Sequence, residues 1–316
     1  MFKNILVPLD GSPVAEAALP YARTVAAGTG ARLILVRAAH LQRPLSDGAD
    51  QQRVIAEAED YLTVQAGQLA RHGFEVQTGV PFGGSAATWI LEEVDMRHAD
   101  MVVMATHDRI GPDRWVHGSV AEVVVGHASV PVLLVGPTHG AHLAERLTSE
   151  QPVLVVPLDG SELAEAALPL AREFATIVGG QIVLVGVVPR PGDLVAAPGG
   201  VMTYVGDEYE RLQAEAQNYL NGIAGQLTAD GLTVAVSVRS GNPAQQIAAT
   251  ASEHNAAGVV MASHGRTGIV RTILGSVAGQ TLHHSPCPVL LIRPARLRPI
   301  EEPVRSRAAG MRMIVA

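Results

Sequence analysis

The sequence is poor in the residues that mark several large classes of protein. Its 316 residues include one cysteine, Cys287, and aromatic residues make up only 3%. A single cysteine excludes a disulfide framework within the chain and favours a reducing environment. Lysine and arginine number 23 against 30 acidic residues, which gives a net charge of −7. A general nucleic-acid-binding protein carries a basic excess instead, so we expect no nucleic-acid partner.

Long hydrophobic runs are absent as well. No stretch approaches the roughly 20 apolar residues that a membrane-spanning helix needs. The first apolar run, within MFKNILVPLDGS, is too short for the apolar region of a signal peptide. We therefore expect a cytoplasmic protein with no membrane partner.

With so few aromatic residues, the core has to be built from Val, Leu, Ile and Ala. Apolar residues make up 47% of the chain and charged residues 17%, as in globular proteins. Such a core is typical of a parallel sheet covered by alanine-rich helices. The length suits two domains, each large enough to bury a core of its own.

The chain contains two copies of one sequence repeat. ILVPLDGSPVAEAALPYAR at 5–23 returns as LVVPLDGSELAEAALPLAR at 154–172, and VPVLLVGP at 130–137 returns as CPVLLIRP at 287–294. Repetition at this scale indicates two copies of one structural unit. The second copy is the longer, and the Pro- and Gly-rich segment 189–208 is the expected insertion. We predict a first domain at 1–145, a second at 151–295, and a flexible tail at 296–316.

Each copy alternates apolar strands with amphipathic helices. Continuous apolar strands between helices predict two tandem doubly wound α/β domains with parallel sheets. In such sheets ligands bind beyond the carboxyl ends of the strands, where the strand order reverses. In the second copy we expect strands at 152–158, 181–188, 233–241, 258–263 and 288–292, and helices at 162–178, 209–231, 243–255 and from Gly275 onward.

A glycine-bearing loop follows one strand of each copy. It reads MASHGRTGIVRTILGSVAG at 261–279 and MATHDRIGPDRWVHGSVAE at 104–122. Glycines after a strand let the backbone approach a phosphate, and the following helix N-terminus attracts negative charge. The spacing of the glycines alone does not decide whether this loop is a phosphate-binding site or a structural turn. GxxxxGK[ST], an early GxGxxG and GxSxG are all missing, which argues against P-loop NTPases, dinucleotide-binding domains and α/β-hydrolases.

These segments together resemble a known family. VPLDGS opens each copy, MASHGRTG…LGSVA lies late in the second, and PCPVLLIRP ends it. Each copy resembles a universal stress protein domain, and the whole chain resembles a tandem universal stress protein. The resemblance implies an adenine-nucleotide α-hydrolase-like fold with the nucleotide motif G-x2-G-x9-G-[ST]. It also implies a protein that binds ATP with little or no hydrolysis.

The resemblance implies a nucleotide-binding site in the second copy. Gly265, Gly275 and Ser276 match the later part of the motif, whereas Ala262 stands at its first glycine. His264 closes its strand, and two roles remain open for it: a contact with a ribose or a metal, and a strand-end cap. The other expected contacts are Pro157 and Leu158 beside the adenine, Asp159 on the base or ribose, Val187 and Met261 as apolar walls, Val277 with Ser276 at the phosphates, and Arg266 as a phosphate-binding charge.

The first copy departs further from the motif. Asp108 takes the place of the second glycine, ahead of Gly118 and Ser119. A carboxylate beside phosphates is repulsive unless a metal ion bridges them. We predict that the second copy binds ATP, with or without Mg²⁺. The first copy, left with Asp10, Gly118 and Ser119, is expected to bind it weakly or not at all.

No metal site of the protein's own is expected. The trio His107, His117 and His127 has no neighbouring cysteine, and its spacing matches no standard zinc pattern. His107 itself is open to the same two roles as His264.

The sequence offers no committed catalytic apparatus, such as a Walker lysine, an evident general base or paired carboxylates. We therefore predict an ATP-binding stress-response regulator without catalytic residues, in which ATP shifts conformational populations toward unknown protein partners. A slow ATPase or phosphotransferase and a nucleotide-independent scaffold remain as alternatives. The resemblance implies that the terminal strands at 130–137 and 287–294 pair inside one chain, and that two chains form a homodimer.

Overall fold

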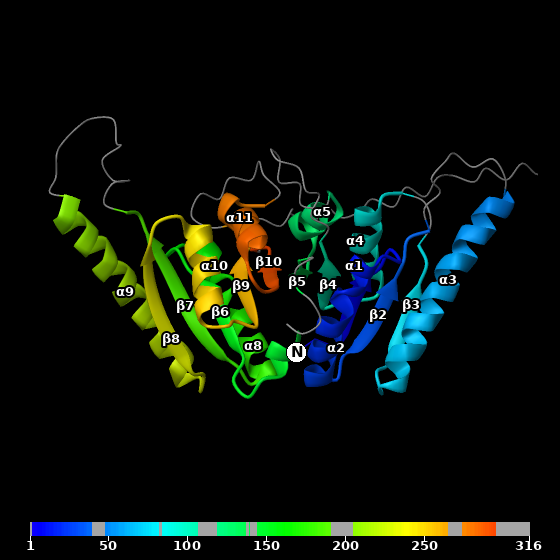
Figure 1. Cartoon of the computed structure of the whole chain (residues 1–316), viewed down its shortest axis with the longest axis horizontal. Coiled ribbons are helices and arrows are strands. Elements are labelled where there is room, and N and C mark those ends of the chain that lie inside the picture. The colour runs from blue at the N-terminus through cyan, green and yellow to red at the C-terminus, as the bar shows by residue number, and fades with distance from the viewer. Residues whose placement is uncertain are drawn as a thin grey trace, which may run out of the picture.

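The strands of both copies form one continuous sheet in the computed structural model, which describes residues 2–39, 48–81, 84–106, 119–136, 139, 144–190, 205–264 and 274–294 (Figure 1). The sheet has ten strands in the order β3-β2-β1-β4-β5-β10-β9-β6-β7-β8. The strands are β1 (Asn4–Pro8), β2 (Arg32–Val36), β3 (Val76–Gly79), β4 (Met101–Ala105), β5 (Val132–Val135), β6 (Val153–Pro157), β7 (Gln181–Val188), β8 (Val234–Ser240), β9 (Gly258–Ala262) and β10 (Val289–Ile292).

Helices separate the strands in the alternation that the sequence predicts, and the α/β fold class is confirmed. A 3₁₀ turn, η1 (Glu145–Thr148), lies between the two copies. Among the described residues, no helix has the combination of length and hydropathy that crossing a membrane requires. The helices are α1 (Pro13–Glu16), α2 (Ala18–Thr29), α3 (Gly48–Arg71), α4 (Ala86–Met96), α5 (Ser119–His127), α7 (Glu162–Glu165), α8 (Leu168–Val178), α9 (Val205–Ala229), α10 (Pro243–Glu253) and α11 (Ser276–His284).

The expectation of one continuous helix over 162–178 is wrong. The segment is divided into α7 and α8, and the first copy is divided in the same way into α1 and α2. Pro169 has no N–H to bond the carbonyl of Glu165, and its ring crowds that carbonyl; Pro20 does the same to Glu16. Serine caps the short helix of each copy, because Ser12 Oγ accepts a hydrogen bond from the Ala15 N–H at 3.1 Å and Ser161 Oγ accepts one from the Ala164 N–H at 3.2 Å.

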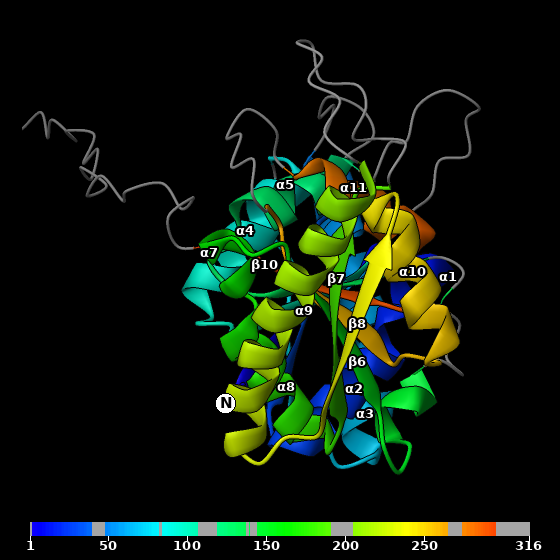
Figure 2. The same cartoon turned by 90° about the vertical axis from the view of Figure 1, so that its left-hand side faces the viewer.

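Helices cover both faces of the sheet, as a parallel sheet with apolar strands requires. One face packs against α1, α2, α3, α7, α8 and α9, which contribute Tyr21, Leu62, Phe174 and Leu220 to the core. The other face packs against α4, α5, α10 and α11, with Ile90, Val124 and Ile247 among the buried side chains. Figure 2 shows α9 and α10 on opposite sides of β7 and β8.

The two copies join along an antiparallel strand pair. β5 and β10 are hydrogen-bonded with Val289 opposite Leu134, whereas the other strand pairs of the sheet are parallel. The predicted pairing of the terminal strands inside one chain is therefore confirmed. The copies also meet where helix α2 packs against helix α8. The two helices are so close that a Cβ on Gly28 of α2 would lie 3.0 Å from Ile177 Cγ2 of α8.

A buried histidine also ties the two copies together. His139 is 3% exposed. Its Nδ1 accepts a hydrogen bond from the Gly136 N–H at 2.8 Å, and its Nε2 donates to the Ser285 carbonyl at 3.0 Å. These two bonds connect the end of β5 with the turn before β10, and they require a neutral imidazole with its proton on Nε2.

Candidate functional site

The strand order of the second copy reverses between β6 and β9. From β6 the chain passes outward to β7 and β8 and then returns to β9 on the other side of β6. The carboxyl ends of β6 and β9 therefore flank the position where doubly wound sheets bind ligands. Pro157 ends β6, with Leu158 and Asp159 immediately after it, and Met261 and Ala262 end β9. These residues of the expected site come together at one edge of the sheet.

Asp159 closes a tight turn after β6. Its Oδ1 accepts hydrogen bonds from both the N–H and the hydroxyl of Ser161, an arrangement typical of aspartate in turns. Asp10 accepts from the Ser12 N–H at 2.8 Å in the first copy. Both aspartates are exposed at strand ends. The turn role is thus present in both copies, and a ligand contact by either carboxylate stays a prediction.

His264 lies at the end of β9 with little exposure to solvent. The residue is 7% exposed and Ser263 is fully buried. The ring nitrogen Nδ1 lies 3.1 Å from Ser263 Oγ, and the Ser263 N–H donates to the Ile292 carbonyl at 2.9 Å. Of the two roles that the sequence leaves open, these contacts favour the strand-end role, and a ribose contact stays a prediction.

Gly275 fastens the start of α11 to the end of β9. Its N–H donates to the Ser263 carbonyl at 2.8 Å. A Cβ at this position would lie 2.9 Å from that same oxygen and 3.4 Å from His264 Cα. The backbone has φ −63° and ψ 150°, which any residue can adopt. Glycine is therefore required here by a close approach between backbone segments and not by its conformational freedom.

The first turn of α11 is open to solvent beside this contact. Ser276 is exposed and Val277 is 36% exposed. No side chain of the described residues caps the helix, so within that part of the chain its first N–H groups have no side-chain acceptor. Unbonded N–H groups at a helix start, next to a glycine, are suited to an anion.

Several predicted residues lie outside the part of the chain that the structure describes. In the second copy these are Gly265 and Arg266, and in the first copy they are Gly118 with its neighbours 107–117, including Asp108. Ser119 is the first residue of α5. The effect of Asp108 on the first copy therefore stays a prediction.

Arg37 is a difference between the copies that the sequence reasoning missed. It follows β2 where Gly186 stands in the second copy, because Pro8 pairs with Val36 and Pro157 pairs with Val185. The guanidinium carbon lies 3.1 Å from where a Cβ on Gly11 would stand, and 4.7 Å above the ring of Tyr61. Aligning RLILVR at 32–37 with QIVLVG at 181–186 would have revealed the exchange. The first-copy turn is thus covered by a cation from a position at which the second copy has Gly186.

In each copy a glutamate of the short helix after the aspartate turn bonds a tyrosine of the long helix. The Tyr61 hydroxyl donates to Glu16 Oε1 at 2.9 Å, and the Tyr219 hydroxyl donates to Glu165 Oε1 at 2.9 Å. Burial and the bond to glutamate raise the pKa of both tyrosines above its usual range. Each pair connects the short helix after the aspartate turn with the long helix of the same copy, which fixes the orientation of the turn.

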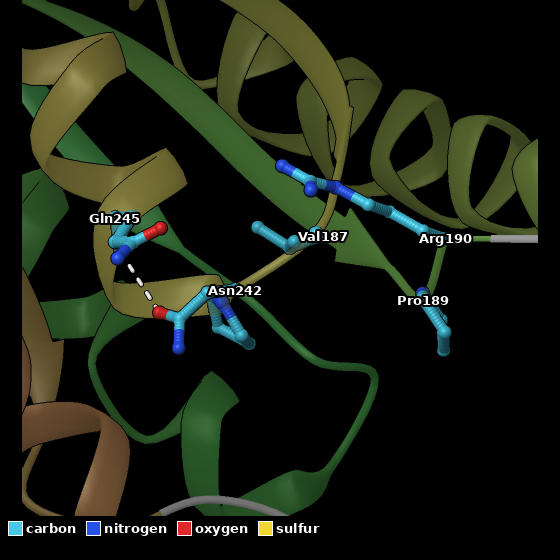
Figure 3. Close-up of a pocket in the computed structure, with 7 residues that line it drawn as sticks. Val187, Pro189, Arg190, Asn242 and Gln245 are labelled. Atoms are coloured by element: carbon cyan, nitrogen blue, oxygen red, sulfur yellow. Dashed lines mark hydrogen bonds between the residues drawn. The ribbon is translucent and has the colours of Figure 1, made fainter. Parts of the chain in front are cut away.

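A cavity of about 500 Å³ extends the site toward β7 and β8. Among the expected site residues, Val187 lines it, and the sequence reasoning missed the rest of its lining. Figure 3 shows Arg190 reaching from the end of β7 above Val187, with Asn242 and Gln245 on the opposite side at the start of α10. The cavity is lined by Val187, Pro189, Arg190, Gly241, Asn242, Pro243 and Gln245.

Comparison with known proteins confirms the repeat and its family. The model of the Universal stress protein family matches residues 1–136 and, a second time, residues 152–293. The chain belongs to the universal stress protein family. Both the resemblance and the tandem arrangement predicted from the sequence are thereby confirmed.

Universal stress proteins from several organisms align with this chain. One from Synechocystis is 29% identical over 148 residues, which cover 44% of this chain and 96% of that protein. One from Mycolicibacterium smegmatis is 29% identical over 226 residues, covering 71% of this chain and 70% of that protein. The crystal structure of a universal stress protein from Archaeoglobus fulgidus superposes with a TM-score of 0.71 at 23% identity, over 92% of this chain and 98% of that one. That likeness shows that the fold is shared over almost the whole chain.

Proposed function

We propose that this universal stress protein binds ATP in its second copy and acts as a stress-response regulator with little or no hydrolysis. The observation that carries the proposal is the contact between Gly275 and Ser263. It holds the open first turn of α11 against the end of β9, next to the aspartate turn after β6. Backbone N–H groups so arranged stabilise phosphate without any catalytic side chain.

The chemistry of the surrounding side chains supports a nucleotide laid across the carboxyl ends of the strands. The hydroxyl of Ser276 and the N–H groups of α11 face the phosphates, and the sequence motif adds Gly265 and Arg266 as expected phosphate contacts. Asp159 has an exposed carboxylate for the ribose or for a magnesium ion that accompanies ATP, since Mg²⁺ prefers oxygen ligands. Leu158, Val187 and Met261 supply apolar surface for the base.

The two copies are proposed to be unequal. Arg37 covers the aspartate turn of the first copy, and Asp108 places a carboxylate in its phosphate loop. Arg37 lies at the turn expected to bind the ribose, and Asp108 falls in the sequence segment expected to bind the phosphates, so each is proposed to oppose binding independently of the other. One ATP per chain follows, and its binding regulates contacts with protein partners by shifting conformational populations.

A homodimer and a cytoplasmic location complete the proposal. Because β5 and β10 are already paired with each other, a homodimer would form through other surfaces. The buried state of Cys287 suits a reducing compartment, since the thiol takes no part in a disulfide.

The test is a pair of matched substitutions, Ser276→Asp in the second copy and Ser119→Asp in the first. Aspartate is favourable in the first turn of a helix, so both variants should fold. Calorimetric titration with ATP should give one site per chain in the wild type. Ser276→Asp should weaken binding at least about tenfold through repulsion of the phosphates, and Ser119→Asp should leave it unchanged.

Each other outcome is informative. If only Ser119→Asp lost ATP binding, the ATP site would have to be assigned to the first copy. A folded wild type that gives no heat at millimolar ATP would refute nucleotide binding. Chromatography of the titrated samples should show ATP intact, and steady release of ADP would establish an ATPase instead.

A further inference from the structure

The cavity beside Val187 contains polar groups that the proposed nucleotide site has not yet used. It lies between the carboxyl ends of β7 and β8 and the start of α10 (Figure 3). Its volume of about 500 Å³ is within the range of roughly 300–1,000 Å³ usual for small-molecule sites. Val187, Pro189 and Pro243 give it apolar surface, and none of the described residues that line it is acidic.

The amide of Asn242 has a fixed orientation in this cavity. Its Oδ1 accepts a hydrogen bond from the Gln245 N–H at 3.1 Å and so caps α10. That bond determines which end of the amide is oxygen, and the Nδ2 group is left as a donor. The Gln245 side chain adds one donor group and one acceptor three residues later. A planar group with an acceptor beside a donor is the natural complement to this pair.

The position of the cavity matches the length of a nucleotide. The strands run in the order β9-β6-β7-β8, and neighbouring strands are about 4.8 Å apart. The gap between β7 and β8 is therefore about 12 Å from β9, where α11 begins. A nucleotide with its phosphates at Ser276 and its ribose near Asp159 extends its base toward Val187 and the cavity.

We propose that Asn242 and Gln245 determine the base specificity of the second copy by reading the amine-bearing edge of adenine. This inference rests on the proposed ATP site. Adenine presents its exocyclic amine as a donor next to a ring nitrogen that accepts. Asparagine and glutamine amides pair with that edge in other adenine complexes. Hypoxanthine, the base of ITP, has a carbonyl in place of the amine and so reverses the polarity at that position.

The first copy supplies a matched replacement for this pair. Ser85 and Thr88 stand at the corresponding positions of α4, where Ser85 Oγ accepts from the Thr88 N–H at 3.2 Å. Their hydroxyl oxygens are 2.8 Å apart. Serine caps a helix about as well as asparagine, so the shorter pair preserves the helix while removing both amides.

The experiment compares ATP and ITP binding to the wild type and to the double variant Asn242→Ser/Gln245→Thr. The wild type should prefer ATP over ITP by about tenfold, the value of one or two neutral hydrogen bonds. The double variant should bind ATP about tenfold more weakly and lose its preference. The reverse exchange in the first copy, Ser85→Asn/Thr88→Gln, should leave the second-copy preference unchanged.

The outcomes separate this inference from the ATP site itself. If the wild type binds ATP and the double variant keeps both the affinity and the ATP-to-ITP ratio, the base-reading role is refuted while the site stands. If the folded wild type binds neither nucleotide, both proposals fail. Should the double variant lose its thermal transition, Gln245→Met, a change of similar size at an exposed position, gives the same readout.

Discussion

Replacing Gly275 with alanine should push the start of α11 away from the end of β9. The added Cβ would lie 2.9 Å from the Ser263 carbonyl oxygen, and that oxygen already accepts the Gly275 N–H at 2.8 Å. Both partners are backbone atoms, so no flexible side chain can move to relieve the contact. Ser263 is held in turn by its N–H bond to Ile292 in β10. The strain must therefore be taken up by α11 or by the strand end.

The expected cost follows from these contacts. Overpacking of this kind costs about 1–3 kcal/mol. A weakened backbone hydrogen bond adds about 1 kcal/mol. We expect Gly275→Ala to lower the free energy of unfolding by about 2–4 kcal/mol in total. ATP affinity should fall as well, because the N–H groups of α11 move relative to Asp159.

Equilibrium unfolding in urea measures the first effect, and calorimetric titration measures the second. Gly222→Ala in α9 is the matched control, since a Cβ there meets nothing within 4 Å. Alanine is favoured over glycine inside a helix by about 0.5–1 kcal/mol, so the control should be stabilised. If Gly275→Ala were as stable as the wild type and bound ATP equally well, the inferred close approach between these backbones would be wrong.

Two further predictions concern the join between the copies. His139→Ala removes the hydrogen-bond partners of Gly136 and Ser285 and should lower the free energy of unfolding in urea by about 2–4 kcal/mol. The control His127→Ala, at an exposed position, should lower it by less than about 0.5 kcal/mol. Equal losses in the two variants would refute the bridging role of His139. Burial raises the pKa of the Cys287 thiol to about 11, so the folded protein at pH 8 should resist thiol reagents that react in denaturant. Because the unfolded thiol ionises near pH 8.5, this group's contribution to stability should fall between about pH 9 and 11, as a comparison with Cys287→Ala would reveal.

The elements of the fold were predictable because the strands are continuous apolar runs and the sequence repeats itself. The expected strand at 181–188 is β7 as observed, and Gly30 ends α2 in the left-handed conformation expected of a C-cap glycine. The division of α7 from α8 was missed because the alanine-rich apolar pattern continues across it. The responsible interaction, between Pro169 and the carbonyl of Glu165, concerns the backbone and leaves no trace in that pattern.

The candidate site was only partly predictable, because its contacts depend on the order of the strands in the sheet. The loop glycines suggested space for a phosphate, and the structure adds that Gly275 is needed for its contact with Ser263 whether or not a ligand binds. Arg37 and the amides at the start of α10 were missed. Their relevance depends on which strand ends lie side by side, and no spacing within one segment encodes that.

The shared sheet gives a physical reason for the two copies to differ. β10 is apolar and would be an exposed edge in an isolated second copy, open to pairing with other chains. β5 covers it. The copies also meet where α2 packs against α8, where Arg146 of η1 donates to the Ala256 carbonyl, and where His139 bonds the Ser285 carbonyl. By covering β10, the first copy is expected to stabilise the second whatever the sequence of its own loop. The contacts of Arg37 with the turn at Gly11 and with the ring of Tyr61 lie within the first copy, so we expect a change at this position to leave the interface intact.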